Sequence, residues 1–205
     1  MTIDKDITST SKLHKRLMNK AVHYLGRYQA SQQRLRRVLR QFAKRKLTPL
    51  SDEAGRQRTG YDEAEISQAI EDIISLCVGY GYVDDKALAQ SRARQSVMTG
   101  QSAYQLSGKL RQMGIDQDTT SQALTYRADE HQDAERAAAI RAMRKKRLGP
   151  YCPDYGELDH TQKQKQFAKL ARLGFSSDLI KSIMRIETRQ EAEEELSDAE
   201  AQPNF

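Results

Sequence analysis

The chain has 205 residues, with 34 Lys and Arg against 28 Asp and Glu, a formal net charge of +6, four Pro and no Trp. This length can bury a sizeable core or several small modules. No segment is apolar enough for a signal peptide or a membrane-spanning helix, which argues against a secreted or membrane protein.

Apolar residues recur at helical spacing along the chain and do not alternate as they would in strands. The first predicted helix carries an apolar stripe from Leu13 to Tyr28, and a second, Ser31–Arg45, begins behind Ser31 as its N-cap. A third carries a stripe from Ile66 to Cys77. Further helices are predicted at about 85–99, 103–113, 118–128, 131–147, 161–173 and 177–188. We therefore predict an all-α fold of nine helices.

An internal repeat organises these helices. The segment "LRQMGI" (Leu110–Ile115) resembles "LARLGF" (Leu170–Phe175), and "LRQF" (Leu39–Phe42) is a degenerate earlier copy. We predict three tandem three-helix repeats that stack as an elongated, curved array. The predicted segments are a disordered N-terminus (1–11), a first repeat (12–80) with an insertion at 45–61, a second repeat (81–128), a third repeat (129–188) with a loop at 148–160, and an acidic tail (189–205). We interpret the end of the chain as a helix continuation that frays into a disordered tail.

The stretch "GYGYVDDKALA" (Gly79–Ala89) raises the question whether two adjacent aspartates serve chemistry or helix capping. Glycine just after a helix suits the left-handed C′ position, and the apolar residue behind it folds back on that helix. This structural motif is predicted at Gly81 with Tyr82 and Val83, at Gly114 with Ile115, and at Gly174 with Phe175. Asp84 or Asp85 then caps the helix that begins at Lys86, which we favour over a metal or acid–base pair.

The charge is distributed unevenly. Residues 12–46 contain twelve Lys or Arg and no Asp or Glu, whereas residues 187–200 contain seven acidic residues and one Arg. A basic front suggests a polyanionic partner, with nucleic acid first. On the Ser31–Arg45 helix the cations fall opposite the apolar face, so we predict an exposed and uncompensated basic surface, with a merely solvated face as the alternative. The candidates there are Arg34, Arg36, Arg37, Arg40 and Lys44.

Other basic residues are secondary candidates for partner or DNA binding. Those at the end of the 131–147 helix also suit the negative end of the helix dipole, which explains them in part. The secondary candidates are Arg144, Lys145, Lys146 and Arg147, then Lys163, Lys165, Lys169 and Arg172, and Lys109 and Arg111 in the middle repeat.

No pattern of catalytic or metal-binding residues stands out. The four His and two Cys lie at no usable ligand spacing, and no phosphate-binding glycine loop or nucleophile motif occurs. We expect no enzyme activity, no metal and no cofactor, with Cys77 and Cys152 reduced in the cytoplasm. Tyr24, Tyr28, Tyr80 and Tyr82 are predicted to pack in the core rather than to stack on bases.

Three stretches of the sequence form a recognisable pattern: "GYVDDKALA" followed by Gly100, Leu106, Leu110 and Gly114–Ile115, then "KQKQFAKLARLGFSSDLI" (Lys163–Ile180), and "AVHYLGRYQASQQRLRRVL" (Ala21–Leu39). Through them, over roughly residues 15–186, the sequence resembles the RecX family, bacterial regulators of the RecA recombinase. Leu88 stands where the family usually has Phe, and Arg92 where it has an aromatic residue.

The resemblance implies an all-helical tandem-repeat protein that binds the groove of the RecA–single-stranded DNA filament. Such binding would limit filament growth, ATPase, strand exchange and coprotease activity. The expected partners are thus the RecA filament and single-stranded DNA, bound by a monomer without membrane contact. A stand-alone basic nucleic-acid-binding protein and a helical scaffold remain alternatives. We further hypothesise that the acidic tail covers the Arg36–Lys44 face as an internal competitor, with a solubilising tail as the alternative.

Overall fold

The prediction of an all-α fold is confirmed by the computed structural model, which describes residues 12–47 and 61–201. Within these residues it has ten α-helices, two short 3₁₀ helices and no strand. The predicted disordered N-terminus and most of the predicted 45–61 insertion lie outside the described residues. The division into three repeats stays a prediction, because the described residues form two compact units, divided between Leu88 and Ala89.

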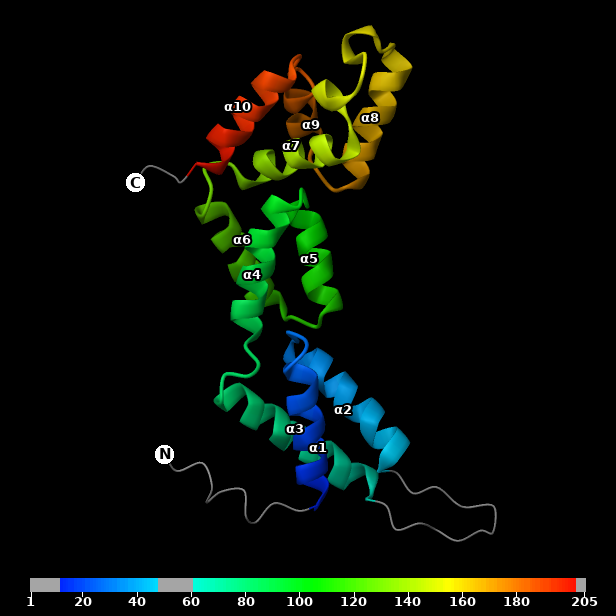
Figure 1. Cartoon of the computed structure of the whole chain (residues 1–205), viewed down its shortest axis with the longest axis vertical. Helices are drawn as coiled ribbons and strands as arrows, with labels where there is room; N and C mark the ends of the chain where they lie inside the picture. The colour runs from blue at the N-terminus through cyan, green and yellow to red at the C-terminus, as the bar shows by residue number, and fades with distance from the viewer. Residues whose placement is uncertain (1–11, 48–60, 202–205) are drawn as a thin grey trace, which may run out of the picture. The chain divides into compact units, whose positions relative to one another are not determined.

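The helices follow the predicted spacing closely along the chain (Figure 1). Their bounds are α1 Lys12–Leu25, α2 Gln32–Lys46, α3 Glu63–Gly79, α4 Asp85–Met98, α5 Ala103–Gln112, α6 Gln117–Asp129, α7 Ala134–Lys146, α8 His160–Arg172, α9 Ser177–Ile183 and α10 Arg189–Glu200. The proline-containing segment between α7 and α8 forms only the 3₁₀ turns η1 Gly149–Tyr151 and η2 Tyr155–Glu157.

The first unit is built on α1, α2 and α3, which pack on one another through their apolar stripes (Figure 1). Leu17, Leu35, Leu39 and Ile70 are fully buried between them. Ser31 caps α2 as predicted, because its hydroxyl accepts a hydrogen bond from the Arg34 backbone N–H at 3.1 Å. The predicted stripe on α2 is shifted slightly, since Ala43 is buried whereas Val38 and Phe42 are only partly buried.

The adjacent aspartates cap helices, but they cap two different ones. Asp84 Oδ1 accepts the Ala87 backbone N–H at 2.9 Å at the start of α4. Asp85 Oδ1 instead accepts the Gln32 backbone N–H at 2.9 Å, at the first turn of α2. The carboxylate of Asp85 therefore joins the start of α4 to the start of α2 within the first unit.

The predicted glycine motif has the expected backbone at all three positions. Gly81, Gly114 and Gly174 have φ values of +71°, +79° and +87°. The apolar residues Val83, Ile115 and Phe175 behind them are buried. Tyr82 does not join them, because it is 59% exposed.

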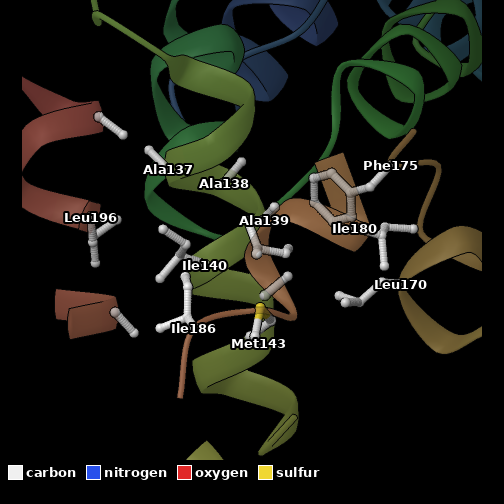
Figure 2. Close-up of a cluster of buried hydrophobic side chains, with 14 of the residues drawn as sticks. Ala137, Ala138, Ala139, Ile140, Met143, Leu170, Phe175, Ile180, Ile186 and Leu196 are labelled. Atoms are coloured by element: carbon white, nitrogen blue, oxygen red, sulfur yellow. The ribbon is translucent and has the colours of Figure 1, made fainter. Parts of the chain in front are cut away.

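The second unit is centred on α7, which buries residues all around its surface. Ala137, Ala138, Ala139 and Ile140 are completely buried, so neighbouring helices must approach α7 from several sides. Figure 2 shows Leu196 of α10 on one side of α7 and Leu170, Phe175 and Ile180, from α8, the turn after it and α9, on the other. Alanines make this close approach possible.

A buried arginine joins α4, α5, α6 and α7 within the second unit. Arg127 of α6 is 4% exposed and donates to Ser96 Oγ at 3.0 Å, to Glu135 Oε2 at 2.7 Å and to the Gln101 carbonyl at 3.1 Å. Glu135 in turn accepts the Ala103 backbone N–H at the start of α5. All three nitrogens of the guanidinium thus donate to groups inside the protein.

The acidic segment was predicted as a helix continuation that frays into disorder; instead Arg189–Glu200 form a separate helix, α10, which brings the number of described α-helices to ten rather than nine. Ala192, Leu196 and Ala199 recur at helical spacing and are buried in the same core as α7. The helix is also tied to the start of α7, since the Asp133 backbone N–H donates to the Ala199 carbonyl at 3.0 Å. The remaining predicted tail, 202–205, lies outside the described residues.

Candidate cationic interface

The basic face of α2 is partly neutralised. Arg36 donates to both carboxylate oxygens of Glu71 on α3, at 2.7 and 2.6 Å, and Arg40 lies 3.9 Å from the same carboxylate. The prediction of an uncompensated surface is therefore wrong at its centre. Arg37 and Lys44 remain exposed without an ion pair to any described residue, and Arg34 donates to the Tyr24 hydroxyl at 3.2 Å.

The bidentate contact also shifts both ionisation equilibria. The hydrogen bond from Arg36 holds the pKa of Glu71 below its ordinary value, and the same bond raises the pKa of Arg36. Both groups therefore stay charged near neutral pH. Since Glu71 is 43% exposed at its side chain, the pair stabilises the fold only modestly.

The carboxylates of α10 pair with arginines of α7 in the second unit. Arg136 binds Glu195, Arg141 binds Glu200, and Arg144 lies 3.2 Å from Glu193. Three carboxylates of the predicted internal competitor are thus engaged by α7, which contradicts a freely moving acidic tail. Of the predicted cluster, Arg144 is paired, whereas Lys145, Lys146 and Arg147 are exposed at the end of α7.

The remaining candidates lie on α5 and α8. Lys109 is exposed and its ammonium donates to Gln101 Oε1 at 2.6 Å, while Arg111 is exposed. Lys163 is half-buried, with its ammonium 5.6 Å from the centre of the Tyr155 ring. Lys165 and Lys169 are exposed, as is Arg172. None of these three makes an ion pair within the described ranges.

Three of the four tyrosines predicted to pack in the core are instead exposed. Tyr28, Tyr80 and Tyr82 are 57%, 51% and 59% exposed, and only Tyr24 packs partly against the core of the first unit. The Tyr80 and Tyr82 rings lie 5.9 Å apart. In the sequence, the apolar stripe next to these tyrosines does not indicate whether their rings face the core or the solvent.

The end of α3 and the turn after it therefore expose apolar side chains, of which the neighbouring Tyr80 and Tyr82 rings form an uncharged patch. Of the eight large exposed apolar side chains among the described residues, four belong to this short segment: Leu76, Val78, Tyr80 and Tyr82. No Asp, Glu, Lys, Arg or His occurs in residues 73–83. Aromatic, charge-poor surfaces of this kind are typical of the centres of protein–protein interfaces.

The described residues show no arrangement for metal chemistry or membrane insertion. No three His, Cys, Asp or Glu side chains among them are grouped closely enough to hold a metal ion. Across residues 12–47 and 61–201, every helix is too short or too polar to cross a bilayer. Within these residues the fold is that of an all-helical protein.

Comparisons with known proteins identify its family. The family model "RecX, third three-helix domain" matches residues 133–184, which hold α7, α8 and α9. The chain is 31% identical to the regulatory protein RecX of Myxococcus xanthus over 82% of this chain and 83% of the relative. It is 28% identical to the regulatory protein RecX of Agrobacterium fabrum over 94% of both chains.

The fold is also that of solved RecX proteins. A crystal structure of RecX from Lactobacillus salivarius matches with a TM-score of 0.61 and 20% identity, covering 84% of this chain and 95% of that one. A second crystal structure of a regulatory protein RecX matches with a TM-score of 0.60. The chain belongs to the RecX family of regulatory proteins, and it is a regulator rather than an enzyme.

Proposed function

We propose that this chain regulates RecA, mainly as an inhibitor, by binding as a monomer in the groove of the RecA–single-stranded DNA filament. Bound there, it limits filament growth and lowers ATPase, strand-exchange and coprotease activity. The observation that carries this proposal is membership of the RecX family over most of the chain. The resemblance of the motif "GYVDDKALA" to the family supplies the link to RecA.

Two kinds of exposed surface support a composite partner of protein and nucleic acid. Unpaired Lys and Arg side chains, such as Lys165 and Lys169, complement phosphates. The uncharged patch at Tyr80 and Tyr82 suits contact with a protein surface instead. A filament of RecA on single-stranded DNA offers both partners along its length.

The proposal is tested by measuring the binding of the fluorescently labelled protein to three targets: RecA alone, single-stranded DNA alone, and the assembled filament. We expect the affinity for the filament to exceed both others by at least about tenfold, because contacts to two components add. Equal affinity for naked DNA and for the filament would instead favour the stand-alone nucleic-acid-binding protein. Binding to none of the three would leave the scaffold alternative.

The role of the uncharged patch is tested with one matched pair of variants. Tyr80→Ser removes a ring that is 51% exposed in the patch, and Tyr28→Ser removes one that is 57% exposed in the segment after α1. We expect Tyr80→Ser to weaken filament binding by about 1 kcal/mol or more and Tyr28→Ser to change it little. Equal effects of the two variants would remove the patch from the proposed contact surface.

A further inference from the structure

One face of α8 carries cations without acidic partners, unlike the centre of the basic surface of α2. Lys165, Lys169 and Arg172 are exposed and fall within an arc of about 60° on the helix, over about 10 Å of its length. No acidic residue occurs between Asp159 and Asp178. The positive field of this stripe is therefore not cancelled from within its own helix, and none of its three cations is held by a carboxylate of another described helix as Arg36 is by Glu71.

The stripe is held rigidly by the opposite side of the helix. Gln166 is 7% exposed and its Oε1 accepts the Gly149 backbone N–H at 2.7 Å, and Leu170 is completely buried. Asp159 caps the helix, with its carboxylate accepting the Gln162 backbone N–H at 2.7 Å. Because these contacts fix which face of α8 is buried, the three cations all lie on its exposed face before a ligand binds.

The chemistry around the cations favours phosphate over a protein surface. The other exposed residues of α8 are His160, Thr161, Gln162, Gln164 and Ala171, most of which have hydrogen-bonding side chains, and no large apolar side chain of α8 is exposed. Protein interfaces are depleted in Lys and depend on buried aromatic or apolar anchors. Phosphate contacts are made by Lys, Arg, Thr and Gln side chains of this kind.

We propose that the α8 stripe of Lys165, Lys169 and Arg172 binds the phosphate backbone of single-stranded nucleic acid directly. This inference rests on the proposed function and assigns one of its two partners to one helix face. Because the side chains contact phosphates rather than base edges, binding is independent of base sequence. The other occupant that the charges allow, a carboxylate-rich protein segment, is an outcome of the test below.

The test compares two variants of the full chain with equal changes of charge. Lys165→Gln/Lys169→Gln/Arg172→Gln neutralises the α8 stripe, and Arg37→Gln/Arg40→Gln/Lys44→Gln neutralises three exposed cations of α2. Binding to an oligothymidylate is measured by fluorescence anisotropy without RecA, over a series of salt concentrations. Far-UV circular dichroism checks that both variants keep their helices.

We expect the α8 variant to lose at least about tenfold in affinity at low salt, and the α2 variant to lose clearly less. Each phosphate contact on a single strand contributes about 0.7 to the slope of log affinity against log salt, so the slope should fall by about 2 in the α8 variant. Polyglutamate at equal charge should compete poorly against the oligothymidylate.

Each of the following results would overturn the inference. These are no binding of the natural chain to oligothymidylate at low salt, equal losses in the two variants, or displacement by polyglutamate as effective as by nucleic acid. The proposed function is judged separately by inhibition of the RecA ATPase. An α8 variant that binds DNA normally, in a protein that still inhibits RecA, would reject the α8 assignment and leave the proposed function standing.

Discussion

Replacing Gly100 by Ala should destabilise the second unit far more than the same change at Gly81 destabilises the first. The two glycines have nearly the same backbone, with φ values of +70° and +71°, so each Ala bears the left-handed penalty of about 1–2 kcal/mol. Their surroundings differ. A Cβ on Gly100 would lie 2.7 Å from the backbone nitrogen of Ala142 in α7, whereas a Cβ on Gly81 meets nothing within 4 Å.

The clash cannot be relieved by a side-chain rotation, because the atoms it meets belong to the backbone of a buried helix. Overpacking of this kind adds about 1–3 kcal/mol, so Gly100→Ala should cost about 2–5 kcal/mol in total. Gly108 supplies a control of opposite sign, since it lies inside α5 and an added Cβ there meets nothing within 4 Å. Ala at this position should stabilise by up to about 1 kcal/mol.

These three variants are compared by urea unfolding followed by far-UV circular dichroism. The expected order of stability is Gly108→Ala above the natural chain, then Gly81→Ala, then Gly100→Ala. If Gly100→Ala proves no more destabilising than Gly81→Ala, then the turn after α4 does not pack against α7 as closely as described, and the reasoning is refuted.

Three further predictions concern single side chains. Arg127→Met should lower the free energy of unfolding by about 3 kcal/mol, because Glu135 then loses the partner of its charge; a loss below about 1 kcal/mol would contradict this. Glu71→Gln should cost at most about 1 kcal/mol at neutral pH. Because Arg36 lowers the pKa of Glu71, the difference in stability between the natural chain and Glu71→Gln is present at pH values above 4.5, the ordinary pKa of a Glu side chain. In acid titrations of stability, this difference should vanish as the pH falls through the lowered pKa of the folded state. Burial, then a hydrogen bond to a carboxylate, raises the pKa of Tyr151 from 10.0 to about 12, so the natural chain should lose stability relative to Tyr151→Phe as pH rises from 10 toward 12; parallel curves would reject this.

The fold was largely predictable because local sequence signals and tertiary packing agree in this chain. Helical spacing located nearly every helix, and glycine after a helix predicted the left-handed turns at Gly81, Gly114 and Gly174. The helix α10 was predicted only as a fraying continuation of the helix before it, although its full length had a signal as well. Ala192, Leu196 and Ala199 are spaced by four and three residues, but the high density of charge favoured the interpretation of the segment as disordered.

The basic surface was harder to predict because ion pairs join residues far apart in sequence. Nothing near Arg36 indicates a carboxylate, since Glu71 reaches it from another helix 35 positions away. Asp85 likewise caps α2 across a separation of 53 residues. The net positive charge of α8 is smaller than that of α2, so its residues were only secondary candidates. Lys165 and Lys169 are nevertheless among the cations that pair with no carboxylate of the described residues.

The central claim, that this RecX-family chain restrains the RecA filament, is tested most directly by titrating it into RecA hydrolysing ATP on single-stranded DNA. We predict that the rate of ATP hydrolysis falls progressively as the protein is added. Inhibition should exceed what the affinity of the protein for naked DNA explains. An unchanged rate at protein concentrations that saturate the filament would contradict the account.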